Sequence, residues 1–168
     1  DKLKITEGSA EAASIAMNKL VEVASLSKSS VEDTATVYSR LNLSMAELNL
    51  GTDAVLGVTL ALQNSFKIMG ATAAEAQGAT IQLGQGLGSA GLRGQELRSV
   101  MEANGLFAGL LAKKLGIARG ELMKWSEKNG GIPTNVVIET LSDNFQYLAE
   151  QAAKMTPTVG EAMTMALD

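Results

Sequence analysis

Glycine residues interrupt the helical pattern of this 168-residue sequence at intervals, and they constrain the fold more than any other feature. Between the interruptions, apolar residues recur every three or four positions, which is typical of amphipathic helices. Gly51, Gly70 and the glycines of residues 84–94 break any heptad repeat, so one long rod is disfavoured. Strand-like alternation is absent. The sequence therefore predicts an all-α fold, a compact bundle of about seven to nine short-to-medium helices with glycine-rich breaks.

The apolar stripes place the helices along the chain. We expect helices over residues 9–26, 30–50, 53–69, 72–87, 94–103, 106–115 and 118–125, a long helix from residue 134, and a final helical stretch after Pro157. The predicted buried faces include Tyr38, Leu41, Met45, Leu48, Val55, Val58, Leu62, Phe66, Met69, Val137, Leu141, Phe145 and Leu148. At the helix starts, Thr72 with Glu75 forms the clearest capping box, Ser30 with Asp33 a weaker one, and Asp53 is a good cap.

The residue types that are missing exclude most catalytic chemistry. The chain has no histidine and no cysteine, so Ser-His-Asp and Cys-His catalysis, thiolate ligands and disulfides are all ruled out. Its net charge of −4 argues against a nucleic-acid surface, which needs a basic stripe. The most apolar stretch, residues 54–69, contains Gln63, Asn64 and Lys67 and is too short to span a membrane. We expect no cofactor, no metal site, no nucleic-acid binding and no membrane span in this segment.

Residues 86–91 match G-x-G-x-x-G, the pattern of dinucleotide-binding loops. That pattern requires a preceding strand, whereas residues 73–85 have helical periodicity and a helix cap. The favoured interpretation is a helix that ends in glycine, followed by a turn that permits close helix packing. The spacing of Gly78, Gly84 and Gly88 likewise suggests that two helices of one bundle approach closely.

Four carboxylates are candidates for acid–base catalysis: Glu96, Glu102, Glu121 and Glu127. None lies in a pattern that predicts a cleft, and all fit polar helix faces. Trp125, the sole tryptophan, lies one turn after Leu122, so core burial is favoured over a role as a binding anchor.

Arg93 and Glu96 flank the start of a short predicted helix. Glu96 suits the positive end of the helix dipole, and a local ion pair with Arg93 would orient the turn. The functional interpretation is a partner interface formed by Arg93, Glu96 and Arg98; the structural one is orientation of the turn.

Five blocks of sequence resemble the tail tape measure proteins of phages and prophages. The resemblance lies in the order and spacing of the blocks taken together. The blocks are residues 70–79, 82–87, 91–102, 112–122 and 130–137. The most specific is residues 91–102, G-L-R-G-Q-E-L-R-S-V-M-E. Gln95 and Arg98 replace the Glu and Asn of the family pattern, and Leu106 stands where a proline is frequent. These departures bear on specific partner contacts, and the region of strongest resemblance is 38–145.

The resemblance implies a structural and assembly protein of the phage tail, which sets tail length and nucleates assembly of the tail tube. It implies tail assembly chaperones, tail tube proteins and tail tip or baseplate proteins as partners, and it allows a homo-oligomer. It implies a location in the tail tube lumen of the virion, and in the bacterial host cytoplasm during assembly.

The glycine breaks indicate in addition that this segment folds compactly. We therefore expect it to be a folded interaction module. We expect residues 1–168 to be a single helical domain, a fragment of a longer tape measure protein. Two other classes stay open from the sequence: a cell-wall hydrolase and an unrelated helical interaction domain.

Overall fold

The computed structural model describes residues 17–21, 31–89 and 91–155, and the description below is confined to them. Residues 17–21 are helical. The labelled elements are α3 (Val31–Ser44), η1 (Ala46–Leu48), α4 (Thr52–Ile68), α5 (Ala73–Leu87), α6 (Gly94–Ala103), α7 (Gly105–Leu115), η2 (Arg119–Glu121), α8 (Leu122–Asn129), α9 (Thr134–Asp143) and α10 (Phe145–Ala153). The predicted all-α bundle is confirmed, and the described residues contain no strand longer than an isolated bridge.

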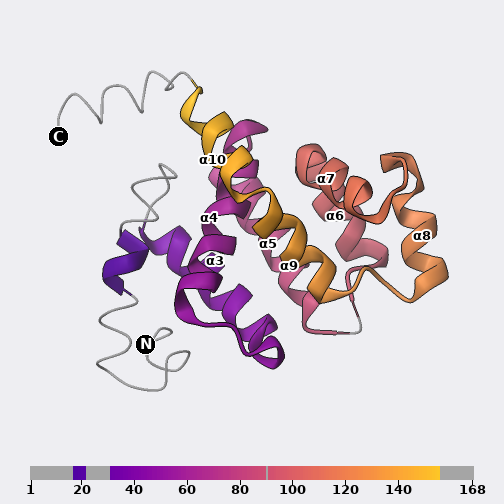
Figure 1. Ribbon diagram of the computed structural model, residues 1–168, viewed down its shortest axis with the longest axis horizontal. Coiled ribbons are helices and arrows are strands. Elements are labelled where there is room, and N and C mark those ends of the chain that lie inside the picture. Colours follow the sequence, from indigo (N-terminus) through magenta and orange to yellow (C-terminus); the bar gives the residue numbers. More distant parts are fainter. Residues whose placement is uncertain (1–16, 22–30, 90, 156–168) are drawn as a thin grey trace.

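Helix α4 lies at the centre of the bundle. It packs against α3, α7, α9 and α10, while α5 packs between α3 and α6. Ten of its 17 residues are buried, as expected for a helix that neighbours cover on several sides. Figure 1 shows α6, α7 and α8 gathered at one end of the long axis, away from α3. One apolar cluster connects both ends of this arrangement.

The second and third predicted helices differ from expectation at their ends. Helix α3 ends at Ser44 and a short 3-10 helix follows, so Leu48 is 38% exposed and not buried. Helix α4 begins after Gly51, and Asp53 forms an ion pair with Lys19 in place of the predicted cap. Met69 follows the last residue of α4 and is 45% exposed, so its predicted burial is wrong. Apolar residues that recur every 3.6 positions indicate a helix, but they do not indicate the residue at which it ends.

The long helix predicted from residue 134 is two helices, α9 and α10. Asn144 separates them, with φ −104° and ψ 9°. Its side-chain amide donates to the carbonyl of Thr140 at 2.7 Å, an example of an asparagine that competes with the helical backbone. The break changes the phase of the stripe, and Phe145 is therefore 38% exposed, whereas Leu148 is fully buried as predicted.

Some predictions fall outside the described residues. These are most of the helix at 9–26, the cap at Ser30 and the stretch after Pro157. Within residues 17–21, Leu20 is fully buried.

The capping box at the start of α5 forms as predicted. The Glu75 N–H donates to Thr72 Oγ1 at 3.1 Å, and the Thr72 N–H donates to Glu75 Oε1 at 2.9 Å. These bonds satisfy two amides that the first turn of a helix leaves unpaired. The hydrogen bond from the Thr72 backbone is the largest of the effects that lower the pKa of the Glu75 carboxyl below its ordinary value of 4.5.

Acidification is expected to remove the contribution of this capping box to stability. Because the folded-state pKa of Glu75 is lowered, its stabilisation is complete above about pH 4.5 and is lost as the pH falls through the lowered pKa. Thermal unfolding of the wild type and of Glu75→Gln should give midpoints that converge as the pH is lowered. A difference between the two midpoints that stays constant at acid pH would contradict this account.

Candidate functional site

Two glycine-containing loops lie against each other where α5 leads into α6 and α8 leads into α9. The Leu92 N–H donates to the Ile132 carbonyl at 2.9 Å, and the Ile132 N–H donates to the Leu92 carbonyl at 2.8 Å. The Ser126 hydroxyl also donates to the Leu92 carbonyl, at 3.0 Å. Leu92, Ser126 and Ile132 are all fully buried. We call this pairing the clasp; it joins two of the sequence blocks that carry the family resemblance.

The clasp requires glycine on both of its strands. Gly91 has φ +137° and Gly131 has φ +109°, conformations that other residues rarely adopt. A Cβ atom on Gly91 would lie 3.0 Å from the Ile132 carbonyl oxygen, and one on Gly131 would lie 3.1 Å from the Gly91 carbonyl carbon. The obstacle is backbone in both cases, so no side chain can move to make room.

The G-x-G-x-x-G segment is the end of helix α5, as the favoured interpretation predicted. The helix continues through Gly84 and Gly86 and ends at Leu87, as predicted. Gly86 is the close contact: a Cβ there would lie 2.8 Å from Leu92 Cδ1. Gly84 is buried, but Gly78 is exposed with nothing within 4 Å of its Cβ position. Close helix packing therefore does not account for Gly78.

The three predicted interface residues lie together on the first half of α6. Arg93 is the N-cap residue, Glu96 lies in the first turn, and Arg98 follows it. Arg93 and Arg98 are exposed and Glu96 is half-buried. The local ion pair expected between Arg93 and Glu96 is not formed, because the three salt bridges of the described chain involve other residues. Both arginines are thus available to solvent on the same short helix.

An ion-pair cluster that the sequence did not reveal joins α7 to α9. Lys114 Nζ lies 2.8 Å from Asp143 Oδ2 and 3.5 Å from Glu139 Oε2. The hydrogen bond to Asp143 is the main reason that the pKa of Lys114 is raised above its ordinary value of 10.5. Glu139 and Asp143 are one helical turn apart, which is a recognisable pattern, but nothing local links either of them to Lys114.

The carboxylates considered for catalysis are spread over three elements. Glu96 and Glu102 lie on α6, Glu121 on η2 and Glu127 on α8. Within the part of the chain that the structure describes, no group of three or more acidic residues could hold a metal ion. Trp125 is half-buried and packs against the core, close to its predicted role. Among the same residues, no helix is long and apolar enough to cross a membrane.

Gly109 lies inside α7, and no nearby atom would prevent a larger residue at this position. Nothing lies within 4 Å of the position of its Cβ, and its φ is outside the left-handed region. Gly109→Ala is therefore expected to raise the free energy of unfolding by about 0.5–1 kcal/mol, measured by urea denaturation. A loss of stability would show instead that α7 needs the glycine for a contact within the chain.

Comparisons with known proteins identify a family without adding a solved structure. No curated protein and no solved structure matches the chain. A family model described as "Tape measure protein" matches residues 1–166, nearly the whole sequence. The match confirms the resemblance of the five sequence blocks, and it removes the alternative of an unrelated helical domain. The chain therefore belongs to the tape measure protein family, and its role is a structural one in the phage tail.

Proposed function

We propose that this segment is a folded interaction module of a tape measure protein, and that the length of the tail is set by other regions of the parent chain. The observation that carries the proposal is the shortness of the helices. The longest labelled helix, α4, has 17 residues, which corresponds to roughly 25 Å at about 1.5 Å per residue. Short helices folded back on each other give little length per residue, whereas a ruler needs a long extended element.

The wider role proposed for the parent protein follows the family. It would set tail length and nucleate assembly of the tail tube, with tail assembly chaperones, tube proteins and tip or baseplate proteins as partners. It would act in the host cytoplasm during assembly and lie in the tube lumen of the finished virion. The folded segment would contribute docking to a partner, through surfaces such as the one formed by Arg93, Glu96 and Arg98.

The experiment is an in-frame deletion in the phage that encodes the protein, followed by electron microscopy of the tails. Removal of residues 31–155 should reduce the number of complete tails sharply, because a docking function is lost. The few tails that form should keep their normal length. Tails that form in normal number but are shorter in proportion to the deleted residues, by about 1.5 Å each, would show that this segment is part of the ruler.

The surface formed by Arg93, Glu96 and Arg98 can be tested separately by charge reversal. Arg93→Glu with Arg98→Glu should lower the yield of complete tails and leave thermal unfolding of the purified segment unchanged, since both side chains are exposed. Arg40→Glu, at an exposed position on α3, is the matched control for a charge reversal elsewhere. Equal yields from the double variant and the control would remove Arg93 and Arg98 from the interface.

A further inference from the structure

We propose that the outer face of α7 and the adjoining face of α10 bind an amphipathic helix with an acidic flank, supplied by a partner protein. The inference rests on the proposed function in one respect, that the segment is an interaction module, and it names a second surface and the chemistry of its partner. We call this the α7–α10 surface, and it comprises Met69, Leu106, Gly109, Leu110, Lys113 and Tyr147.

Large apolar side chains are exposed on this surface. Met69 is 45% exposed and Tyr147 is 46% exposed, while Leu106 and Leu110 are half-buried. Tyrosine and methionine are enriched at protein interfaces, because each offers a large contact area that adapts to its partner. The core buries Phe107 and Leu111 on the opposite face of α7, whereas Leu106 and Leu110 pack against the edge of the core and stay partly exposed.

The packing of the helices brings these residues level with one another. The start of α7 lies at the end of α4, where Asn104 bonds to Ser65 at 2.7 Å. The end of α7 lies at the end of α9, where Lys114 pairs with Asp143. Helix α10 begins beside Gly57, in the first half of α4, and packs along α4. Helices α7 and α10 therefore run in opposite directions.

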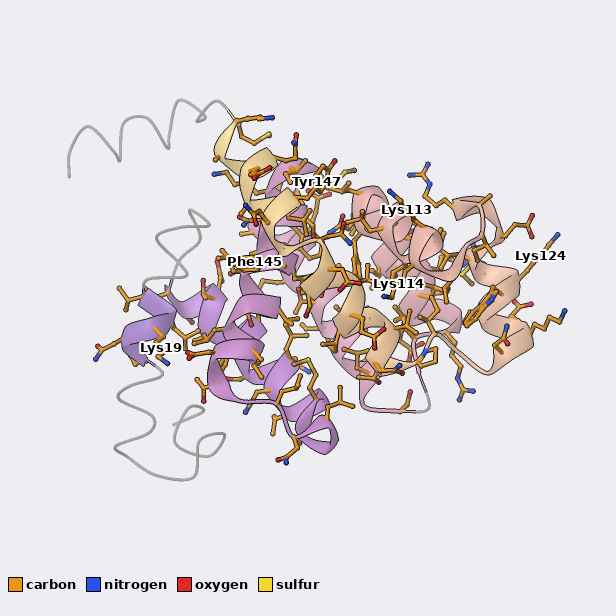
Figure 2. The ribbon with its side chains drawn as sticks, in the orientation of Figure 1. Lys19, Lys113, Lys114, Lys124, Phe145 and Tyr147 are labelled. Atoms are coloured by element: carbon orange, nitrogen blue, oxygen red, sulfur yellow. The ribbon has the colours of Figure 1, made fainter. Side chains whose placement is uncertain are left out.

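Tyr147 is the α10 residue that faces α7. Leu110 precedes Lys114 by one turn of α7, and Tyr147 lies in the first turn of α10, shortly after the Asp143 that pairs with Lys114. In Figure 2, Tyr147 lies on the side of α10 toward α7, and Phe145 lies on the other side. At the top of the surface, the Met69 methyl group lies 3.6 Å from the Cβ position of Gly105. Met69 thus lies beside the start of α7, and Tyr147 lies on the side of α10 toward that helix.

Gly109 makes the surface flat at its centre. A glycine inside a helix costs about 0.5–1 kcal/mol relative to alanine, and no neighbour in the chain accounts for this one. A flat position between Leu106 and Lys113 allows the backbone of another helix to approach α7 closely. A third helix laid along two antiparallel helices is a common packing arrangement and a common mode of peptide recognition.

The charged residues around the α7–α10 surface determine which kind of helix can bind there. Lys113 is exposed one turn after Gly109, and Arg119 donates to the Gly105 carbonyl at 3.3 Å, so cations border the surface along α7. Helices α7 and α10 together contain one acidic residue, Glu150, so cations outnumber acids around the surface. A second copy of the chain would present the same cation-rich face and only this one carboxylate, which disfavours a two-fold dimer here. The occupant is therefore acidic and comes from a different protein.

The test uses two synthetic fluorescein-labelled helical peptides that share one leucine face. One carries glutamate along the flank of that face and the other carries lysine. Fluorescence anisotropy with the 168-residue chain should give about tenfold tighter binding of the glutamate peptide, and the difference should shrink as salt is raised. Equal affinity for the two peptides, or no binding of either up to about 1 mM, would overturn the proposal.

Two variants and two matched controls locate the site, and Figure 2 labels all four positions. Lys113→Glu and Tyr147→Ser should each weaken the glutamate peptide by about tenfold. Lys124→Glu makes the same charge reversal on α8, and Phe145→Ser removes an exposed aromatic from the other side of α10; neither should change the affinity. Losses of the same size in the controls would contradict the location.

Further outcomes distinguish a failure of the proposed α7–α10 surface from a failure of the proposed function. Sedimentation that shows a dimer of the chain, dissociated by Lys113→Glu, would replace the acidic partner by a second copy and so overturn the proposal. The peptide measurement does not involve tails. If deletion of the segment leaves tail assembly intact, the proposed function fails while peptide binding stands. If the deletion abolishes assembly and no peptide binds, only the α7–α10 surface fails.

Discussion

Gly131→Ala is expected to lower the free energy of unfolding by about 3 kcal/mol or more. Two costs combine at this position. The φ of +109° is strained for any side chain, and the new Cβ would lie 3.1–3.2 Å from the backbone of Gly91. Relief of that contact requires the clasp to open, which would break the two hydrogen bonds between Leu92 and Ile132.

Urea denaturation followed by circular dichroism measures this effect, and Gly130→Ala separates its two causes. Gly130 also has a left-handed φ, +74°, but its Cβ position is open. Its substitution should cost only the conformational strain, about 1 kcal/mol. If the two variants are equally stable, the close approach of the two loops contributes nothing and the clasp is a passive contact.

Asn104→Ala is expected to lower the free energy of unfolding by about 2–4 kcal/mol. Asn104 is fully buried between α6 and α7. Its Oδ1 accepts the Phe107 N–H at 3.0 Å and caps α7, and its Nδ2 donates to Ser65 Oγ at 2.7 Å. Alanine would leave the Phe107 amide without a partner in a site that water does not reach. It would also remove the polar link between α4 and α7.

The control is the same substitution at an exposed asparagine. Asn129 donates to the Trp125 carbonyl at 2.8 Å at the exposed end of α8, and Asn129→Ala should change stability by less than about 0.5 kcal/mol. Thermal or urea unfolding of both variants provides the comparison. Equal losses would mean that the buried hydrogen bonds of Asn104 are worth no more than a surface contact.

Features that depend on neighbours in the sequence could be predicted. The Thr72 and Glu75 capping box needs only a short segment of chain, and helix α6 has the predicted bounds of 94–103. The end of α3 and the break at Asn144 were missed because both depend on competition between local hydrogen bonds and the helix. The apolar stripe continues through residue 145 in the sequence and gives no sign of that competition.

Features that depend on distant residues could not be predicted. The sequence indicated that the turn at Gly91 permits a close approach, but not that the approaching segment is Ile132, some forty residues later. Lys114 and its partner Asp143 are 29 residues apart, and Glu139 is also distant in the sequence. Arg93, Glu96 and Arg98 were predicted from local pattern, whereas the exposure of Met69 and Tyr147 follows only from where α4 ends and how α10 packs.

The position of Trp125 gives the protein a built-in optical reporter. It is the single tryptophan of the chain, and it directly precedes Ser126, whose hydroxyl and carbonyl both bond to the clasp. Its indole is half-buried against the core, so its emission responds to water that enters beside it. Separation of the two loops can therefore be followed in the unlabelled molecule, in stopped-flow mixing as well as at equilibrium, with no second tryptophan to subtract.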